Sequence, residues 1–141
     1  MKKHTAYAVW SGSLKEGEGK LTTNSKVLNN HPYCFNSRFG NGTATNPDEL
    51  LASSHAGCFA MALSLILGQH GFTPQSLDVK AEVTMDAEKL ALTGSHLTLK
   101  ARIPNIDQKQ FMECAMAAKE NCPISKALSI PITMEATLEN A

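Results

Sequence analysis

The chain has 141 residues, enough for one ordinary domain, and its 13 basic and 13 acidic residues cancel. No cluster of lysine and arginine stands out, which argues against a nucleic-acid partner. The N-terminus lacks the apolar segment of a signal peptide, and the longest apolar stretch, Cys58–Leu67, is shorter than a membrane span of about 20 residues. We therefore expect one soluble domain over residues 1–141, cytoplasmic and without a membrane partner.

The N-terminal third predicts a small sheet. Residues 6–10 are typical of a strand, and residues 20–28 predict its hairpin partner across a glycine-rich turn. Residues 31–39 are short and aromatic, which fits either a further strand or an extended loop.

A long helix follows. Asn46 is a suitable N-cap, Pro47 suits the first helical position, and the helix should run to about Gln69 because Gly71 is a natural stop. Its body is apolar on nearly every side, which is typical of a helix that is buried all round. A domain this small can hardly surround such a helix, so we expect a second subunit to help cover it.

The C-terminal half alternates between strands and helices. Residues 77–85 and 90–103 have the period of two that predicts a hairpin with one wet face. Residues 107–122 have helical spacing, Pro123 starts a short second helix, and residues 130–138 predict a closing strand. This order of elements predicts an α+β domain.

Four cysteines, Cys34, Cys58, Cys114 and Cys122, occur without any C-x-x-C pair. That spacing argues against a thioredoxin motif and against a zinc ribbon. In a reducing compartment the four thiols are inert, or form a catalytic pair, or include some of each.

The two cysteines in helical contexts differ in their surroundings. Cys122 precedes Pro123, and a helix cap there favours a thiolate, although a turn with a small buried side chain explains the residue equally well. Cys58 lies in mid-helix and needs a nearby cation or base to react. His55, three residues earlier, is a candidate base that nothing else in the sequence supports, and we favour a hydrogen-bonded core histidine. A metal site would need a second ligand pair that the sequence lacks.

Arg38 and Glu49 each have an ordinary interpretation, as a solvated arginine and as a carboxylate that serves the helix dipole. Together they suit a thiol site, since a guanidinium stabilises a thiolate and a carboxylate can orient the guanidinium. Glu49 and Cys58 are nine residues apart (58 − 49), about 13.5 Å along a straight helix and on opposite sides. Either the helix bends, or Glu49 belongs to the site of the partner's Cys58 in a dimer.

Two segments carry a resemblance to a known family. FNSRFGNGTATNPDELLASSHAGCFAMALSLILGQHGFTP, followed downstream by NCPISKAL, resembles the OsmC/Ohr family of organic hydroperoxide reductases, and most closely its OsmC branch. The specific feature is the pair of cysteine motifs, 64 residues apart (122 − 58). The resemblance extends over nearly the whole chain.

The resemblance implies an intertwined homodimer in which long central helices are wrapped by antiparallel-rich sheets. It implies that Cys58 attacks the peroxide, that Cys122 resolves the product, and that Arg38 and Glu49 form the activating pair. Organic hydroperoxides are the implied substrates and a dithiol, lipoyl-type in this family, the implied reductant. The resemblance implies no metal and no bound cofactor.

We therefore expect a peroxiredoxin-like thiol peroxidase that acts through a Cys58 sulfenic acid and a Cys58–Cys122 disulfide, in defence against oxidative and osmotic stress. Two other interpretations stay open: a general thiol–disulfide oxidoreductase, and a non-enzymatic dimer that binds a small ligand.

The remaining cysteines and the apolar residues near the proposed site have weaker assignments. Cys34 and Cys114 match no catalytic motif of the family, so we expect structural thiols. Phe39, Phe59 and Met61 are candidates for an apolar pocket that would favour alkyl hydroperoxides, and each is equally suited to the core.

Overall fold

The computed structural model describes residues 1–140, which divide into two compact units, residues 1–50 and residues 51 onward. Each unit contains one three-stranded sheet, and helices occur in both. Strands and helices follow one another in a mixed order, so the chain has the predicted α+β class. That residues 1–141 form one domain stays a prediction.

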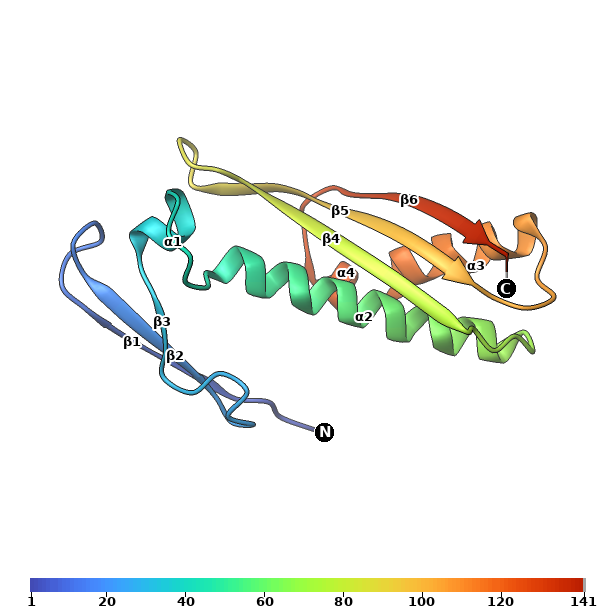
Figure 1. Cartoon of the computed structure of the whole chain (residues 1–141), viewed down its shortest axis with the longest axis horizontal. Coiled ribbons are helices and arrows are strands. Elements are labelled where there is room, and N and C mark those ends of the chain that lie inside the picture. Colours follow the sequence, from blue (N-terminus) through green and yellow to red (C-terminus); the bar gives the residue numbers. More distant parts are fainter. Residues whose placement is uncertain (141) are drawn as a thin grey trace. The chain divides into compact units, whose positions relative to one another are not determined.

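The sheet of the first unit has the order β1–β2–β3, with both pairs antiparallel (Figure 1). Its strands are β1 (Ala6–Ser11), β2 (Glu18–Thr23) and β3 (His31–Tyr33). The predicted first strand is confirmed, but its partner ends at Thr23 rather than at residue 28. Lys26 and Asn30 adopt φ values of 65° and 53°, a turn conformation that cannot continue a strand.

A short helix, α1 (Phe35–Phe39), occupies part of the segment for which a strand or loop was expected. Ser37, which is buried, holds this helix in place. Its Oγ accepts from the Cys34 backbone N–H at 2.9 Å and donates to the Thr45 carbonyl at 2.9 Å. Asn46 Nδ2 donates to the Ser37 carbonyl at 3.0 Å, which ties α1 to the start of the next helix.

The long helix α2 (Pro47–Gln69) has the bounds that its sequence predicts. At its start, Asn46 Oδ1 accepts from the Glu49 backbone N–H at 2.8 Å, as an N-cap does. At its end, Gly71 adopts φ 83°, and the Phe72 N–H donates to the Leu67 carbonyl at 2.9 Å. These are the features of a Schellman C-cap, which requires a residue that tolerates positive φ.

The sheet of the second unit joins β4 (Ser76–Asp86), β5 (Ala91–Arg102) and β6 (Ile132–Glu139). β4 and β5 form the predicted antiparallel hairpin, whereas β6 pairs with β5 in parallel. A parallel pair needs a long crossover, and α3 (Gln108–Asn121) and α4 (Pro123–Ala127) supply it (Figure 1). The two predicted helices and the closing strand are thus confirmed.

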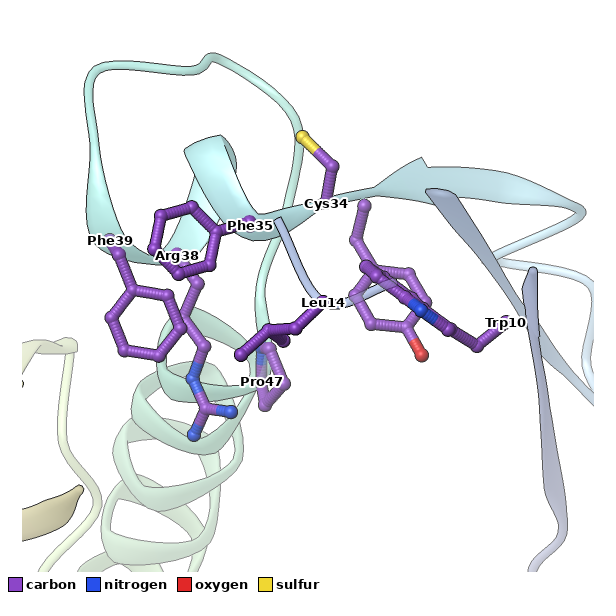
Figure 2. A pocket seen from close by; sticks show the side chains of 8 residues that line it. Trp10, Leu14, Cys34, Phe35, Arg38, Phe39 and Pro47 are labelled. Carbon is purple, nitrogen blue, oxygen red and sulfur yellow. The ribbon is translucent and has the colours of Figure 1, made fainter. Parts of the chain in front are cut away.

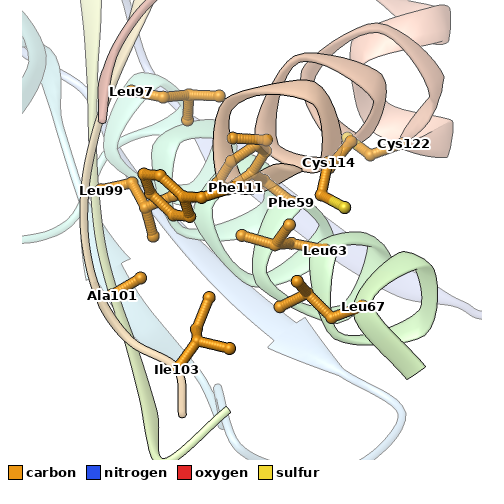
Figure 3. Packing of buried hydrophobic residues seen from close by; sticks show 12 residues of the cluster. Phe59, Leu63, Leu67, Leu97, Leu99, Ala101, Ile103, Phe111, Cys114 and Cys122 are labelled. Atoms are coloured by element: carbon orange, nitrogen blue, oxygen red, sulfur yellow. The ribbon is translucent and has the colours of Figure 1, made fainter. Parts of the chain in front are cut away.

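The core of the second unit lies between one face of this sheet and the helices α2 and α3 (Figure 3). Side chains at four-residue spacing on α2 pack with alternate β5 residues and with one stripe of α3. The fully buried members include Phe59, Leu63, Leu67, Leu97, Leu99, Ala101, Phe111, Ala115 and Ala118. The intervening β5 residues from His96 to Arg102 are polar and lie at least partly in solvent, so the hairpin has the predicted wet face.

The other side of α2 is exposed in the single chain, as expected for an apolar helix that one small domain cannot surround. Met61 is 77% exposed and Leu65 is 65% exposed. By length and composition α2 could cross a membrane, a weak indication because the core helix of a soluble protein passes the same test. An apolar face that one chain leaves open is what a second subunit would cover, and the homodimer stays a prediction.

We expect the protein to sediment as a dimer and Leu65→Asp to raise the dimer dissociation constant at least about tenfold, because a buried leucine contributes about 1.5–3 kcal/mol. Leu90→Asp is the matched control, since Leu90 is 71% exposed in the turn between β4 and β5. Analytical ultracentrifugation measures both. A monomeric wild type, or equal dimer constants for the two variants, would contradict the expectation.

Candidate functional site

Two cysteine side chains of the second unit are neighbours although they are 64 residues apart. Cys58 lies on α2 and is partly buried. Cys122 lies at the junction of α3 and α4, where it is fully buried and caps α4 by accepting the Ser125 backbone N–H at 3.3 Å. The Cys122 side chain lies close enough to Cys58 to shift its pKa.

The surroundings of Cys58 oppose its ionisation. Burial raises the pKa of the Cys58 thiol, the Ile124 backbone N–H lowers it, and the Cys122 side chain raises it again, with a net rise. These groups all belong to the second unit. A thiol whose pKa is raised is a poor nucleophile at neutral pH, so catalysis at Cys58 calls for a cation in addition to these groups.

His55 is a hydrogen-bonded core histidine, as its sequence context suggested. Its Nδ1 lies 2.7 Å from Ser95 Oγ, and its Nε2 lies 2.8 Å from Ser125 Oγ. Burial lowers the pKa of His55, so the imidazole is neutral at physiological pH. Ser125 Oγ in turn accepts from the Cys122 thiol at 3.1 Å. Sequence reasoning missed both serines, which are 40 and 70 residues from His55 along the chain.

Within one chain, the carboxylate that contacts Arg38 is Asp48 rather than the expected Glu49. Arg38 Nη2 donates to Asp48 Oδ1 at 3.1 Å, and Nε donates to Oδ2 at 3.3 Å. This is a bidentate pair, the strongest form of a guanidinium–carboxylate contact. The Asp48 side chain is only 13% exposed, so water screens the pair less than it would a surface pair.

Glu49 has other partners, which explains the difference. Its backbone N–H donates to the Asn46 cap, and its Oε2 accepts from Thr45 Oγ1 at 2.9 Å. Successive residues on a helix point about 100° apart, so Asp48 and Glu49 cannot both face Arg38. The acidic pair in the first turn was the correct signal, but it did not tell which carboxylate faces the arginine.

Arg38 also borders an apolar cavity of 290 Å³ within the first unit, lined by aromatic side chains that include Trp10, Tyr33 and Phe39. Figure 2 shows the guanidinium between Phe39 and Pro47 on one side of the cavity, with Trp10 on the other. The Arg38 guanidinium carbon lies 5.5 Å from the centre of the Phe39 ring, within cation–π range.

Of the three predicted pocket candidates, only Phe39 lines this cavity. Phe59 is fully buried in the core of the second unit, and Met61 is exposed on α2. Cys34 lies in the cavity wall, and hydrogen bonding by Ser37, chiefly by its backbone N–H, lowers the pKa of the Cys34 thiol. Cys114 is a core thiol whose pKa is raised, mainly by burial.

Comparison with known proteins identifies the fold. An OsmC-like protein from Mycoplasma pneumoniae superimposes with a TM-score of 0.74 at 17% identity, over 97% of each chain. OhrB of Bacillus subtilis superimposes with a TM-score of 0.64 at 24% identity, over 96% of this chain and 98% of that chain. The chain therefore has the fold of the OsmC and Ohr proteins.

Sequence comparison identifies the family. The family model described as OsmC-like protein matches residues 40–137. The chain is 42% identical over 135 residues to the peroxiredoxin OsmC of Escherichia coli K12, with 94% of each chain covered. It is 29% identical over 114 residues to the organic hydroperoxide resistance protein OhrB of Bacillus subtilis, with 77% of this chain and 80% of that one covered. The chain belongs to the OsmC-like protein family, as the resemblance predicted.

Proposed function

We propose that this protein is a thiol peroxidase that reduces organic hydroperoxides to alcohols. The observation that carries the proposal is the adjacency of Cys58 and Cys122 in a chain of the OsmC-like family. Relatives over most of its length are named a peroxiredoxin and an organic hydroperoxide resistance protein, and both names are consistent with this chemistry.

In the first proposed step, the Cys58 thiolate attacks the terminal oxygen of the hydroperoxide. The S–O bond forms, the O–O bond breaks, and the alkoxide takes up a proton to become an alcohol. The Cys58 sulfur is oxidised to a sulfenic acid while the peroxide is reduced.

In the second step, Cys122 attacks the Cys58 sulfur. The S–S bond forms, the S–O bond breaks, and water leaves. A dithiol, for which we propose a lipoyl-type reductant, then reduces the disulfide with two electrons. The proximity of the Cys58 and Cys122 side chains favours this route.

Arg38 is the group that we propose for activating Cys58. A guanidinium is a permanent cation in proteins, and Asp48 occupies two of the five N–H donors of Arg38. The remaining donors suit a thiolate or a developing alkoxide. We propose that Asp48, not Glu49, orients Arg38. Glu49 instead makes hydrogen bonds with Thr45 and Asn46 at the start of α2.

The apolar cavity beside Arg38 supports an organic rather than an inorganic substrate. Its aromatic wall would bury the alkyl or aryl part of a hydroperoxide, whereas hydrogen peroxide has no apolar part to bury. We propose that the protein works in the cytoplasm as a homodimer, in which Arg38 acts on Cys58 within one chain or between the two chains.

The direct test is hydroperoxide consumption by the purified protein with dihydrolipoamide. We expect faster turnover of cumene hydroperoxide than of hydrogen peroxide, and loss of turnover in Cys58→Ser, because the reacting sulfur is then absent. Cys122→Ser should still complete a first turnover but stall at the Cys58 sulfenic acid.

Full activity in Cys58→Ser would contradict the mechanism. Turnover no higher than that of free dithiol would favour a ligand-binding dimer, and reduction of insulin without peroxide consumption would favour a general thiol–disulfide oxidoreductase.

The neighbouring acids Asp48 and Glu49 provide a matched pair of variants. Asp48→Asn removes the charge that holds Arg38, so we expect kcat/KM for cumene hydroperoxide to fall about 10-fold to 100-fold, the cost of losing about 1.5–3 kcal/mol of a charged hydrogen bond. Glu49→Gln retains the Arg38 pair and should stay close to wild type. Steady-state kinetics measures both, and a larger loss in Glu49→Gln would reverse the assignment.

A further inference from the structure

A chain of four buried side chains joins sheet, helix and thiol in the second unit. Ser95 Oγ lies 2.7 Å from His55 Nδ1, His55 Nε2 lies 2.8 Å from Ser125 Oγ, and Ser125 Oγ lies 3.1 Å from Cys122 Sγ. All four residues are at least 94% buried. The proposed peroxidase mechanism gives no role to the first three of them.

Burial gives Cys122 a chemical problem that Cys58 does not share. A resolving thiol reacts as its thiolate, so it must lose a proton. Cys122 is 0% exposed, which leaves bulk water no access to that proton. The side-chain oxygen that contacts its sulfur is Ser125 Oγ, and the Ser125 backbone N–H already donates to the sulfur.

The other three hydrogen-bonded side chains, Ser125, His55 and Ser95, are arranged to receive the proton. His55 is neutral, so one ring nitrogen accepts a hydrogen bond and the other donates one. When the Cys122 thiol donates to Ser125 Oγ, the Ser125 hydroxyl can donate to His55 Nε2, and His55 Nδ1–H can donate to Ser95 Oγ. Each of these donors then has an acceptor in one continuous direction.

We propose that Ser125 and His55 form a proton relay that activates Cys122 for the resolving step. The inference rests on the proposed peroxidase function and extends it to these two residues. His55 is a positioning residue, because it acts on Cys122 only through Ser125, and Ser95 holds its far nitrogen. The same helix, α2, thus carries Cys58 and, three residues earlier, the histidine that serves the second thiol.

The thiol proton moves from Cys122 Sγ to Ser125 Oγ while the Ser125 proton moves to His55 Nε2. The Cys122 thiolate attacks the Cys58 sulfenic sulfur, the S–S bond forms and the S–O bond breaks. Cys122 is oxidised, Cys58 is reduced, and the departing hydroxide with the proton that His55 gives up makes one water.

The test separates the two chemical steps in a single turnover with cumene hydroperoxide. Rapid quenching and mass spectrometry follow the Cys58 sulfenic acid, trapped with dimedone, and the Cys58–Cys122 disulfide. The variants are Ser125→Ala, which removes the hydroxyl, and His55→Gln, which keeps hydrogen-bonding groups but cannot take up the proton. Ser129→Ala is the matched control, since Ser129 is exposed four residues after Ser125.

We expect both test variants to form sulfenic acid at the wild-type rate and to form the disulfide about 100-fold more slowly, within the usual range for general acid–base groups. Ser129→Ala should match wild type in both steps, and Ser125→Thr, which retains a hydroxyl, should recover disulfide formation. Circular dichroism reports whether each variant is folded. If Ser125→Ala does not fold, the rate of disulfide formation in His55→Gln tests the relay alone.

Disulfide formation at the wild-type rate in folded His55→Gln would overturn the relay, as would equal slowing of both steps. The wild type reports separately on the proposed function, which fails if hydroperoxide produces no Cys58 sulfenic acid. Diamide, which modifies Cys58 without any peroxide, then still allows the attack of Cys122 to be compared between wild type and the variants. A much slower attack by Cys122 in the variants than in the wild type supports the relay, and equal rates of attack exclude it.

Discussion

The packing of α2 against β5 and α3 is the constraint on which the thiol site depends. Phe59, Leu63 and Leu67 follow one another at four-residue spacing and are fully buried, each contributing about 1.5–3 kcal/mol. Their burial fixes the rotation of the helix about its axis. With that rotation set, His55 points to its two serines, and Cys58, one residue before Phe59, lies beside Cys122.

The same packing has a cost for reactivity. Burial places two thiols together but raises the pKa of Cys58 and isolates Cys122 from water. We propose a different group for each thiol: a charged arginine, oriented by Asp48, for the attacking thiol, and a neutral serine–histidine relay for the resolving thiol. Both devices are held by hydrogen bonds of 2.7–3.3 Å to residues in fixed secondary structure.

Local signals in the sequence were sufficient for most elements. Asn46, Pro47 and Gly71 mark the ends of α2 because capping depends on residues within one turn. The helix α1 was missed because a five-residue helix has little intrinsic stability, and contacts of Ser37 and Asn46 hold it. Likewise Asp48 and Glu49 are indistinguishable by sequence, and only the position of Arg38 in space separates them. The serines around His55 come from distant segments, so no spacing rule could have found them.

The most direct measurement is peptide mapping of the protein after one equivalent of cumene hydroperoxide. We expect a single intramolecular Cys58–Cys122 disulfide, with Cys34 and Cys114 left as free thiols. A disulfide that involves Cys34 or Cys114, or a Cys58 that stays reduced while the hydroperoxide is consumed, would contradict the assignment of the two reacting thiols.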